Sequence, residues 1–291
     1  VQRGAAGQHH PVTVEIAGRH YERTYSLMQL DADHLCLTVK KVDQGLVSSW
    51  LVEQAKVGDI VYLGQPYGDM QQHIQTPNLL LLAAGSGITP MLSLIESLSQ
   101  TKQFSTTSVQ LMYWVKTQAD AAYAEYFKET AENFPHFSYQ IFYTQEQDQR
   151  LNQSYVDQMS ALNETTVYAC GPSGFVSTAE KLFSCAALLQ TEAFSLSQFD
   201  VDASETGFIN VRLTQSNKTV AIPKGQSILF SLEHQGIKPN HGCRMGICNK
   251  CACTKAQGST KNLLNGSANH EPAQLLKICV NSAQSDLVID L

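Results

Sequence analysis

The chain has 291 residues, of which 43% are hydrophobic and 16% charged, and its formal net charge is −6. This length predicts two or three domains, and no apolar run approaches the eighteen residues of a membrane span. Residues 206–291 hold nine Lys and Arg against four Asp and Glu, a net +5, whereas the rest of the chain carries −11. The shift in charge predicts a domain boundary near residue 206. The basic excess is modest and lacks interleaved aromatic residues, so we expect no nucleic-acid partner.

The first segment alternates short strands with turn residues. Strands are predicted at 11–16, 34–40 and 59–63, and Arg23–Ser26 is expected to close another strand. Period-two patterning at this spacing favours an antiparallel barrel or sandwich, assigned to residues 1–75.

The rhythm changes at about residue 76. The continuous apolar run 78–84 is typical of a strand buried on both faces. Strand–helix alternation follows, which predicts a parallel sheet with helices on both faces over residues 76–196. The later strands are expected at 109–115, 137–143 and 166–170, and the helices at 90–99, 119–132, 154–161 and 174–188.

The last segment is predicted to be a small α+β domain. Residues 197–205 are polar and acidic and are interpreted as a linker, and the domain itself is assigned to 206–291. Its strands are expected at 208–213, 219–222 and 286–291, and its helix at 227–234.

The cysteine pattern of this last domain is the strongest signal in the sequence. Cys243, Cys248 and Cys251 have the x4 and x2 spacing of a plant-type [2Fe–2S] ferredoxin, and Cys279 follows after a long interval. Structural zinc is the alternative, but zinc sites prefer pairs of closely spaced cysteines. Cys253 is interpreted as a buried thiol. Residues 206–291 resemble the β-grasp ferredoxin fold.

The cellular location is predicted from the same cysteines. Val1 leads into no apolar export signal, and patterned cysteines without such a signal favour metal binding over disulfides. We therefore expect a cytoplasmic protein.

Two pieces of the first segment resemble the flavin-binding barrel of the ferredoxin-NADP reductase family. Arg23 offers a bidentate fork for a pyrophosphate, Tyr25 offers an aromatic wall, and the resemblance places Ser26 at the flavin N5. The family's barrel has at least one more strand before Gly7, so we expect that the chain lacks its beginning. FAD is the expected flavin and FMN the alternative. The flavin contacts implied by the resemblance are Arg23, Thr24, Tyr25, Ser26, Val39, Lys40, Gly45, Val47, Ser48 and Ser49.

The middle segment carries two nucleotide motifs. A glycine turn with Gly85, Gly87, Thr89 and Pro90 follows the buried strand, and glycines there let the backbone approach a pyrophosphate at a helix start. The run 168–175 resembles the Cys-Gly-Pro motif of the same family, which implies that Cys170, beside the nicotinamide, is a positioning residue. The remaining contacts of this second motif are Gly171 and Pro172.

The choice between NADPH and NADH depends on the end of the second strand of this sheet. A 2′-phosphate requires a cation there, and Lys116 occupies the position, with Thr117 as a supporting donor. The sequence therefore leans towards NADPH, with NADH as the alternative.

The domain order resembles the reductase components of bacterial oxygenase and desaturase systems, as in the phthalate dioxygenase reductase type. The resemblance implies hydride transfer from NAD(P)H to flavin beside Ser26, Thr89 and Cys170, then single-electron transfer to the cluster and to an external acceptor protein. A fatty-acid desaturase or hydroxylase is the favoured acceptor, and a membrane-bound one is compatible with this scheme. The alternatives are a Rieske oxygenase, a hybrid-cluster protein, or a redox carrier or sensor without turnover.

A basic rim around the metal loop is also predicted. It consists of Arg244, Lys250, Lys255 and Lys261, and it would steer an acidic partner or dock on the acidic remainder of the chain.

Overall fold

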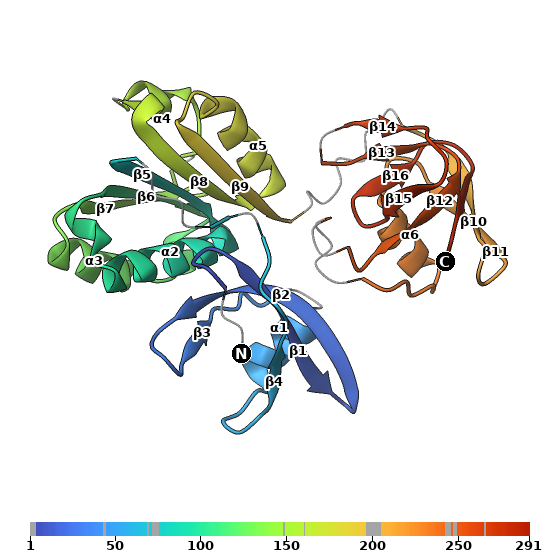
Figure 1. The fold of residues 1–291 in the computed structure, drawn as a ribbon, viewed down its shortest axis with the longest axis horizontal. Coiled ribbons are helices and arrows are strands. Elements are labelled where there is room, and N and C mark those ends of the chain that lie inside the picture. The colour runs from blue at the N-terminus through green and yellow to red at the C-terminus, as the bar shows by residue number, and fades with distance from the viewer. Residues whose placement is uncertain are drawn as a thin grey trace. The chain divides into compact units, whose positions relative to one another are not determined.

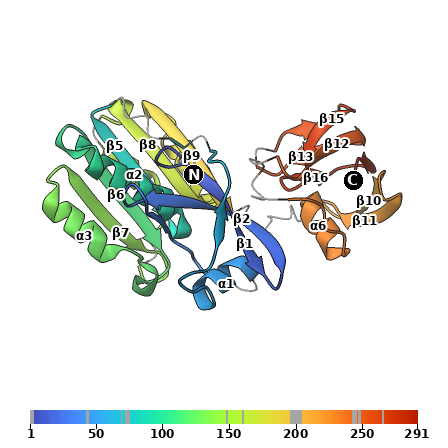
Figure 2. The same cartoon turned by 60° about the horizontal axis from the view of Figure 1, so that its bottom comes forward.

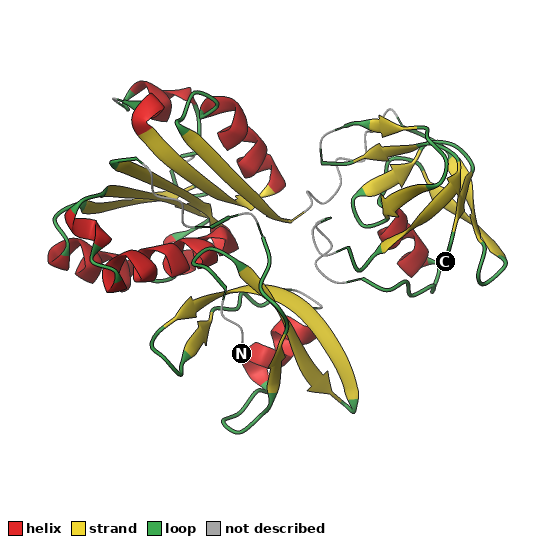
Figure 3. Cartoon of the chain, viewed as in Figure 1, coloured by secondary structure: helices red, strands yellow, loops and turns green. Residues whose placement is uncertain are grey.

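The chain forms two compact units, residues 1–194 and 195–291. The computed structural model describes residues 4–42, 45–68, 70–71, 76–147, 149–159, 161–195, 205–241, 246, 249–264 and 266–291. Cys243, Cys248 and all of the predicted linker except Glu205 lie outside these ranges. Figures 1 and 3 show the strands and helices of each unit.

An antiparallel four-stranded sheet opens the first unit, with strand order β3-β2-β1-β4. Its centre is the long hairpin of β1 and β2, in which Val12 and Val14 are fully buried. Arg23–Ser26 lies inside β2 and does not close it, because pairing with β3 extends the strand three residues further. The elements are β1 (His9–Ile16), β2 (Arg19–Gln29), β3 (Leu35–Leu37), α1 (Leu46–Glu53) and β4 (Val61–Leu63).

A five-stranded sheet of order β7-β6-β5-β8-β9 completes the first unit. The pairs β5–β6, β5–β8 and β6–β7 are parallel, which confirms the predicted α/β arrangement. The strands are β5 (Asn78–Ala84), β6 (Ser108–Val115), β7 (Phe137–Tyr143), β8 (Thr165–Pro172) and β9 (Leu188–Ser195). The helices are η1 (Gly85–Gly87), α2 (Ile88–Gln100), η2 (Gln103–Ser105), η3 (Gln118–Asp120), α3 (Ala124–Asn133), α4 (Gln153–Asp157), η4 (Leu162–Glu164) and α5 (Ser173–Leu182).

Both faces of this parallel sheet are covered, as its apolar central strand requires. Leu79 and Leu81 of β5 pack in one core with residues of α2 and α3. Leu80 and Leu82 point to the other face and pack with residues of α4 and α5. The two helix pairs accordingly lie on opposite sides of the sheet (Figure 1), and Figure 2 shows α2 and α3 beside the strands β5, β6 and β7.

The predicted helix 174–188 is wrong in its second half. The helix α5 ends at Leu182, and the chain returns as β9 beside β8. The predicted helix 119–132 likewise divides into η3 and α3.

The second unit contains a five-stranded sheet of order β11-β10-β17-β12-β15 and a three-stranded sheet of order β14-β13-β16. The strand nearest the C-terminus, β17, lies in the middle of the larger sheet, parallel to β10 and antiparallel to β12. The elements are β10 (Phe208–Leu213), β11 (Lys218–Pro223), α6 (Ile228–His234), β12 (Ala252–Gln257), β13 (Thr260–Asn262), β14 (Ala268–Asn269), β15 (Gln274–Lys277), β16 (Asn281–Ala283) and β17 (Leu287–Ile289).

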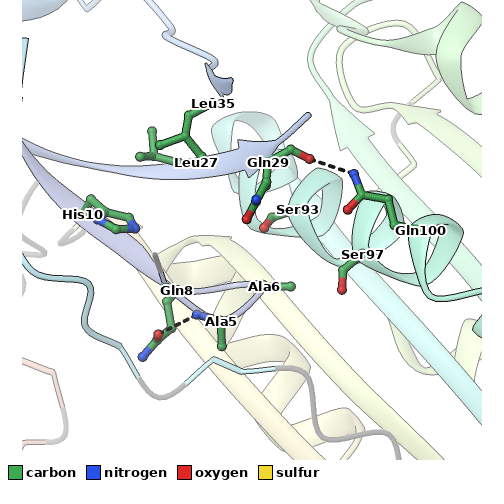
Figure 4. Close-up of a pocket in the computed structure, with 11 residues that line it drawn as sticks. Ala5, Ala6, Gln8, His10, Leu27, Gln29, Leu35, Ser93, Ser97 and Gln100 are labelled. Carbon is green, nitrogen blue, oxygen red and sulfur yellow. Dashed lines mark hydrogen bonds between the residues drawn. The ribbon is translucent and has the colours of Figure 1, made fainter. Parts of the chain in front are cut away.

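Hydrogen bonds connect the antiparallel sheet of the first unit to α2, the helix that packs on the parallel sheet. The Gln100 side chain donates to the main-chain oxygen of Gln29 at 3.0 Å, and the Gly7 amide donates to the Ser93 hydroxyl at 3.3 Å. A small cavity of about 170 Å³ lies along this junction, and Figure 4 shows its lining, including the Gln29–Gln100 contact. None of the described helices combines the length and the apolar character needed to cross a bilayer.

Candidate active site

The two nucleotide motifs are in direct contact. Gly87 lies so close to the end of β8 that a Cβ atom there would be 2.1 Å from the Cys170 carbonyl oxygen. Only glycine fits this position, which explains why the turn after β5 carries it. The Thr89 hydroxyl donates to the Ser86 carbonyl at 3.1 Å, and this bond holds the turn against the start of α2.

A pocket of about 520 Å³ opens at the carboxyl ends of the parallel strands, where open α/β sheets bind their ligands. It brings together predicted residues from four segments of the chain. Among the described residues that line it, three are cations and one, Asp120, is a carboxylate. Its lining includes Lys40, Gly85, Lys116, Arg150 and Pro172.

Thr117 is engaged in a local turn. Its hydroxyl donates to the Asp120 carboxylate at 2.8 Å, and its amide donates to the same oxygen at 3.1 Å. The pKa of Asp120 is held below its usual value, first by the Thr117 hydroxyl and further by the charges of Lys40 and Lys116. Thr117 therefore organises the end of β6, and Arg150 is a cation of this pocket that the sequence did not single out.

A buried polar cluster lies between the two sheets of the first unit. Ser26 stands opposite His9 in the β1–β2 register, and Nδ1 of His9 lies 2.9 Å from Oε1 of Glu192 on β9. The exposed fractions of these three side chains are 7% or less. Burial raises the pKa of Cys170 well above its usual value, and the charge of Glu192 raises it further. Ser26, His9, Glu192 and Cys170 thus share one water-excluded region.

Ser26 offers an observation that tests the predicted flavin site. Its hydroxyl oxygen is buried and has no hydrogen-bond partner among the described residues. A buried polar atom left unpaired is unfavourable, so it marks a place where a bound group completes the hydrogen bonding. The residues therefore fit a flavin whose polar ring edge reaches Ser26.

The other predicted flavin residues have these positions. Arg23 is half-buried and donates to the Glu22 main-chain oxygen, and burial raises the pKa of Tyr25, which the charge of Arg23 partly offsets. The Ser48 hydroxyl accepts from the Val42 amide and donates to the Gly45 carbonyl, so it shapes the loop before α1. The hydroxyl groups of Thr24 and Tyr67 share a hydrogen bond. Val39 and Lys40 lie after β3 and not within it. In α1, Val47 is buried and Ser49 is half-buried.

The cavity in Figure 4 lies on the other face of β2. Leu27 and Gln29 line it, whereas Ser26 points away, as the alternation of a strand requires. None of the predicted cofactor-binding residues lines it, so we assign it no ligand.

Two of the four predicted cluster ligands, Cys251 and Cys279, belong to the described part of the structure, and their side chains are in contact. The Sγ atoms of Cys251 and Cys279 are 3.0 Å apart, both side chains are buried, and neither forms a disulfide. Their hydrogen bond is the main reason why the pKa of Cys251 falls to about 6, with the nearby Lys277 charge as a smaller cause. A thiolate is the form that ligates iron, so this pair fits an iron–sulfur cluster.

Comparison with known proteins agrees with this division of the chain. Three family models match in order: an oxidoreductase FAD-binding domain at residues 3–72, an oxidoreductase NAD-binding domain at 81–181, and a 2Fe-2S iron-sulfur cluster binding domain at 211–281. An NADPH oxidoreductase of Mycobacterium tuberculosis is 32% identical over 98% of this chain and 76% of that protein. The chain belongs to the ferredoxin-NADP reductase-like flavoproteins that carry a [2Fe–2S] domain.

Other relatives of this family differ in the partner that their names imply. The ferredoxin reductase component of a 3-ketosteroid-9-alpha-monooxygenase, also from M. tuberculosis, is 25% identical over 91% of this chain and 78% of its own. The structure of phthalate dioxygenase reductase superposes with a TM-score of 0.67 over 99% of this chain and 88% of that one, at 24% identity, which supports the shared fold. FAD, a pyridine nucleotide and a [2Fe–2S] cluster are therefore the cofactors of this reductase.

Cys253 is a buried thiol, as the sequence predicted. It is 7% exposed on β12, and burial raises its pKa to about 12. A thiol this strongly protonated is a poor metal ligand.

The predicted basic rim is wrong for one of its described members. Lys255 is fully buried, and its ammonium donates to the main-chain and side-chain oxygens of Asn269 at 2.8 and 2.7 Å. Lys261 forms an ion pair with Glu205 at 3.0 Å. Lys250 is exposed, and Arg244 lies outside the described residues. Sequence charge alone did not distinguish a buried lysine on a strand from a surface one.

Proposed function

We propose that this reductase takes hydride from NADPH and delivers electrons singly to an oxygenase component. The observation that carries the first half is the pocket at the carboxyl ends of the parallel strands. Its described lining has three cations, Lys40, Lys116 and Arg150, against one carboxylate, Asp120. Names of relatives support the second half, including the 3-ketosteroid monooxygenase reductases and a toluate 1,2-dioxygenase electron transfer component of Pseudomonas putida.

The chain's own residues position the cofactors, supply charge and form a buried region around the reacting groups. When bound, the flavin accepts a hydride and supplies electrons one at a time, which the amino acids themselves cannot do. Ser26 would hold the polar edge of the flavin, and Cys170 would pack beside the nicotinamide as a neutral thiol, since its pKa is raised. Glu192 and His9 are buried in the same region.

The preference for NADPH rests on electrostatics. A 2′-phosphate adds negative charge to the adenosine end of the nucleotide, and an Arg or Lys that faces it forms charge-assisted hydrogen bonds. Such bonds contribute about 1.5–3 kcal/mol each, which is tenfold or more in affinity. The carboxylate that would favour NADH, Asp120, is held by Thr117.

Binding of adenosine phosphates tests this preference without turnover. Isothermal titration of the flavin-loaded protein with 2′,5′-ADP and 5′-AMP should show tighter binding of 2′,5′-ADP. Lys116→Ala and Arg150→Ala should each weaken 2′,5′-ADP by about tenfold and change 5′-AMP little. Lys181→Ala removes an exposed lysine of α5 that does not line the pocket, and it serves as the control. Equal affinity of the wild-type protein for both ligands would contradict the NADPH assignment.

The acceptor is tested by reconstitution. NADPH-driven reduction of cytochrome c would first exclude a carrier or sensor without turnover. Electron delivery to a purified Rieske-type oxygenase should then exceed delivery to a fatty-acid desaturase. The desaturase and the cytoplasmic location stay predictions from the sequence, and a faster desaturase reaction would reverse the proposed order of acceptors.

A further inference from the structure

Lys277 connects the two segments that supply the described cluster ligands. It is the last residue of β15, two positions before Cys279, and its ammonium donates to the Gly246 carbonyl at 2.6 Å. Gly246 belongs to the loop between the predicted ligands Cys243 and Cys251. The side chain therefore fastens Gly246 to the strand that leads to Cys279.

The main chain of Lys277 braces the other segment. Its carbonyl accepts hydrogen bonds from the Val280 amide at 3.2 Å and from the Asn281 side chain at 3.0 Å. These two bonds close the turn that carries Cys279. Lys277 thus bonds two segments: its carbonyl accepts from the turn that carries Cys279, and its ammonium donates to Gly246.

The loop at Gly246 is fitted closely to this turn. Gly246 has φ +76°, a conformation that favours glycine, and a Cβ atom there would lie 2.9 Å from a methyl group of Val280. The Gly246 carbonyl is consequently fixed in place where the Lys277 ammonium reaches it.

The charge of Lys277 is not neutralised within the described part of the chain. The side chain is half-buried, and no described carboxylate pairs with it. In the β12–β15 register Lys277 stands opposite Ala252, the residue that follows Cys251. Burial reduces screening by water, so this cation acts more strongly on the ligands than an exposed lysine would.

We propose that Lys277 is a positioning residue for the [2Fe–2S] cluster. Its side chain anchors Gly246 of the cysteine loop, and its charge raises the reduction potential of the cluster. Reduction adds one electron and hence one negative charge to the cluster, and a fixed cation nearby stabilises the reduced form. This inference rests on the cluster that the family assigns to residues 211–281.

Redox titration of the purified holoprotein, followed by electron paramagnetic resonance of the reduced cluster, tests this role. Lys277→Met removes both the donor and the charge, Lys277→Gln keeps a donor without the charge, and Lys277→Arg keeps both. We expect the ratio of reduced to oxidised cluster at a fixed potential to fall about tenfold in the Met and Gln variants, a shift of about 59 mV for one electron. The Arg variant should stay close to the wild-type potential.

The matched control is Lys218→Met, which removes an exposed lysine of β11 in the same unit and should leave the potential unchanged. Iron content is measured for every variant. If Lys277→Met loses iron, the Gln variant decides. Wild-type potential in an iron-replete Gln variant, or an equal shift in Lys218→Met, would overturn the charge effect. Wild-type protein without iron would instead overturn the cluster itself.

Discussion

A single methyl group at Gly87 tests how closely the two nucleotide motifs are packed. In Gly87→Ala the new Cβ would lie 2.1 Å from the carbonyl oxygen of Cys170 and 2.4 Å from its carbonyl carbon. Both are backbone atoms, so no side-chain rotation relieves the overlap, and either the turn or β8 has to move. Overpacking of this kind destabilises by about 1–3 kcal/mol. For a unit of this size that corresponds to a fall in Tm of roughly 2–12 °C.

Gly174→Ala is the matched control for this prediction. It makes the same chemical change in α5, where a Cβ atom would meet nothing within 4 Å. Alanine in a helix is more favourable than glycine by about 0.5–1 kcal/mol, so this variant should melt at or above the wild-type temperature. Calorimetry compares the stability of both variants. Titration with 2′,5′-ADP is confined to Gly87→Ala, because Gly174 lines the nucleotide pocket. If Gly87→Ala melts and binds like the wild type, the close contact between the turn and Cys170 is refuted.

Two further predictions concern buried side chains. Breaking the His9–Glu192 pair with His9→Phe or Glu192→Gln should destabilise the first unit by about 3–5 kcal/mol. In denaturation experiments the double variant should lose less free energy of unfolding than the two single variants together. Additive losses would mean that the two side chains do not interact. At pH 8 the apoprotein should be alkylated by iodoacetamide at the exposed Cys185 before the buried Cys253, whose pKa is raised to about 12. Peptide mass spectrometry compares the two sites, and equal labelling would show that β12 opens readily.

Local patterns predicted much of the parallel sheet. The apolar run at 78–84 coincides with β5, because a strand buried on both faces leaves a continuous apolar signal. The strand β7 coincides with 137–143, where apolar residues alternate with Ser138 and Gln140. The strand β9 gave no such signal. It reads Leu-Leu-Gln-Thr-Glu-Ala-Phe-Ser at the end of the sheet order, and apart from Leu188, which was assigned to the preceding helix, no element was predicted for it.

The candidate site was predictable where one segment carries the chemistry, and it was missed where distant segments meet. The spacing of Cys251 and its neighbours is local, and the sequence was sufficient to predict an iron–sulfur ligand. Glu192 could be recognised as part of the site only once the fold placed it beside His9, because these residues come from opposite ends of the first unit. Lys255 likewise looked like a surface cation until β14 supplied the oxygens of Asn269 that surround its ammonium.

The central place of β17 has a consequence for biosynthesis. Because Leu287–Ile289 separates β10 from β12, the strand that follows Cys251 has no neighbour on that side until β17 has been synthesised. Closure of the cluster-binding sheet must therefore wait for a segment that follows Cys279, the most distant of the predicted ligands.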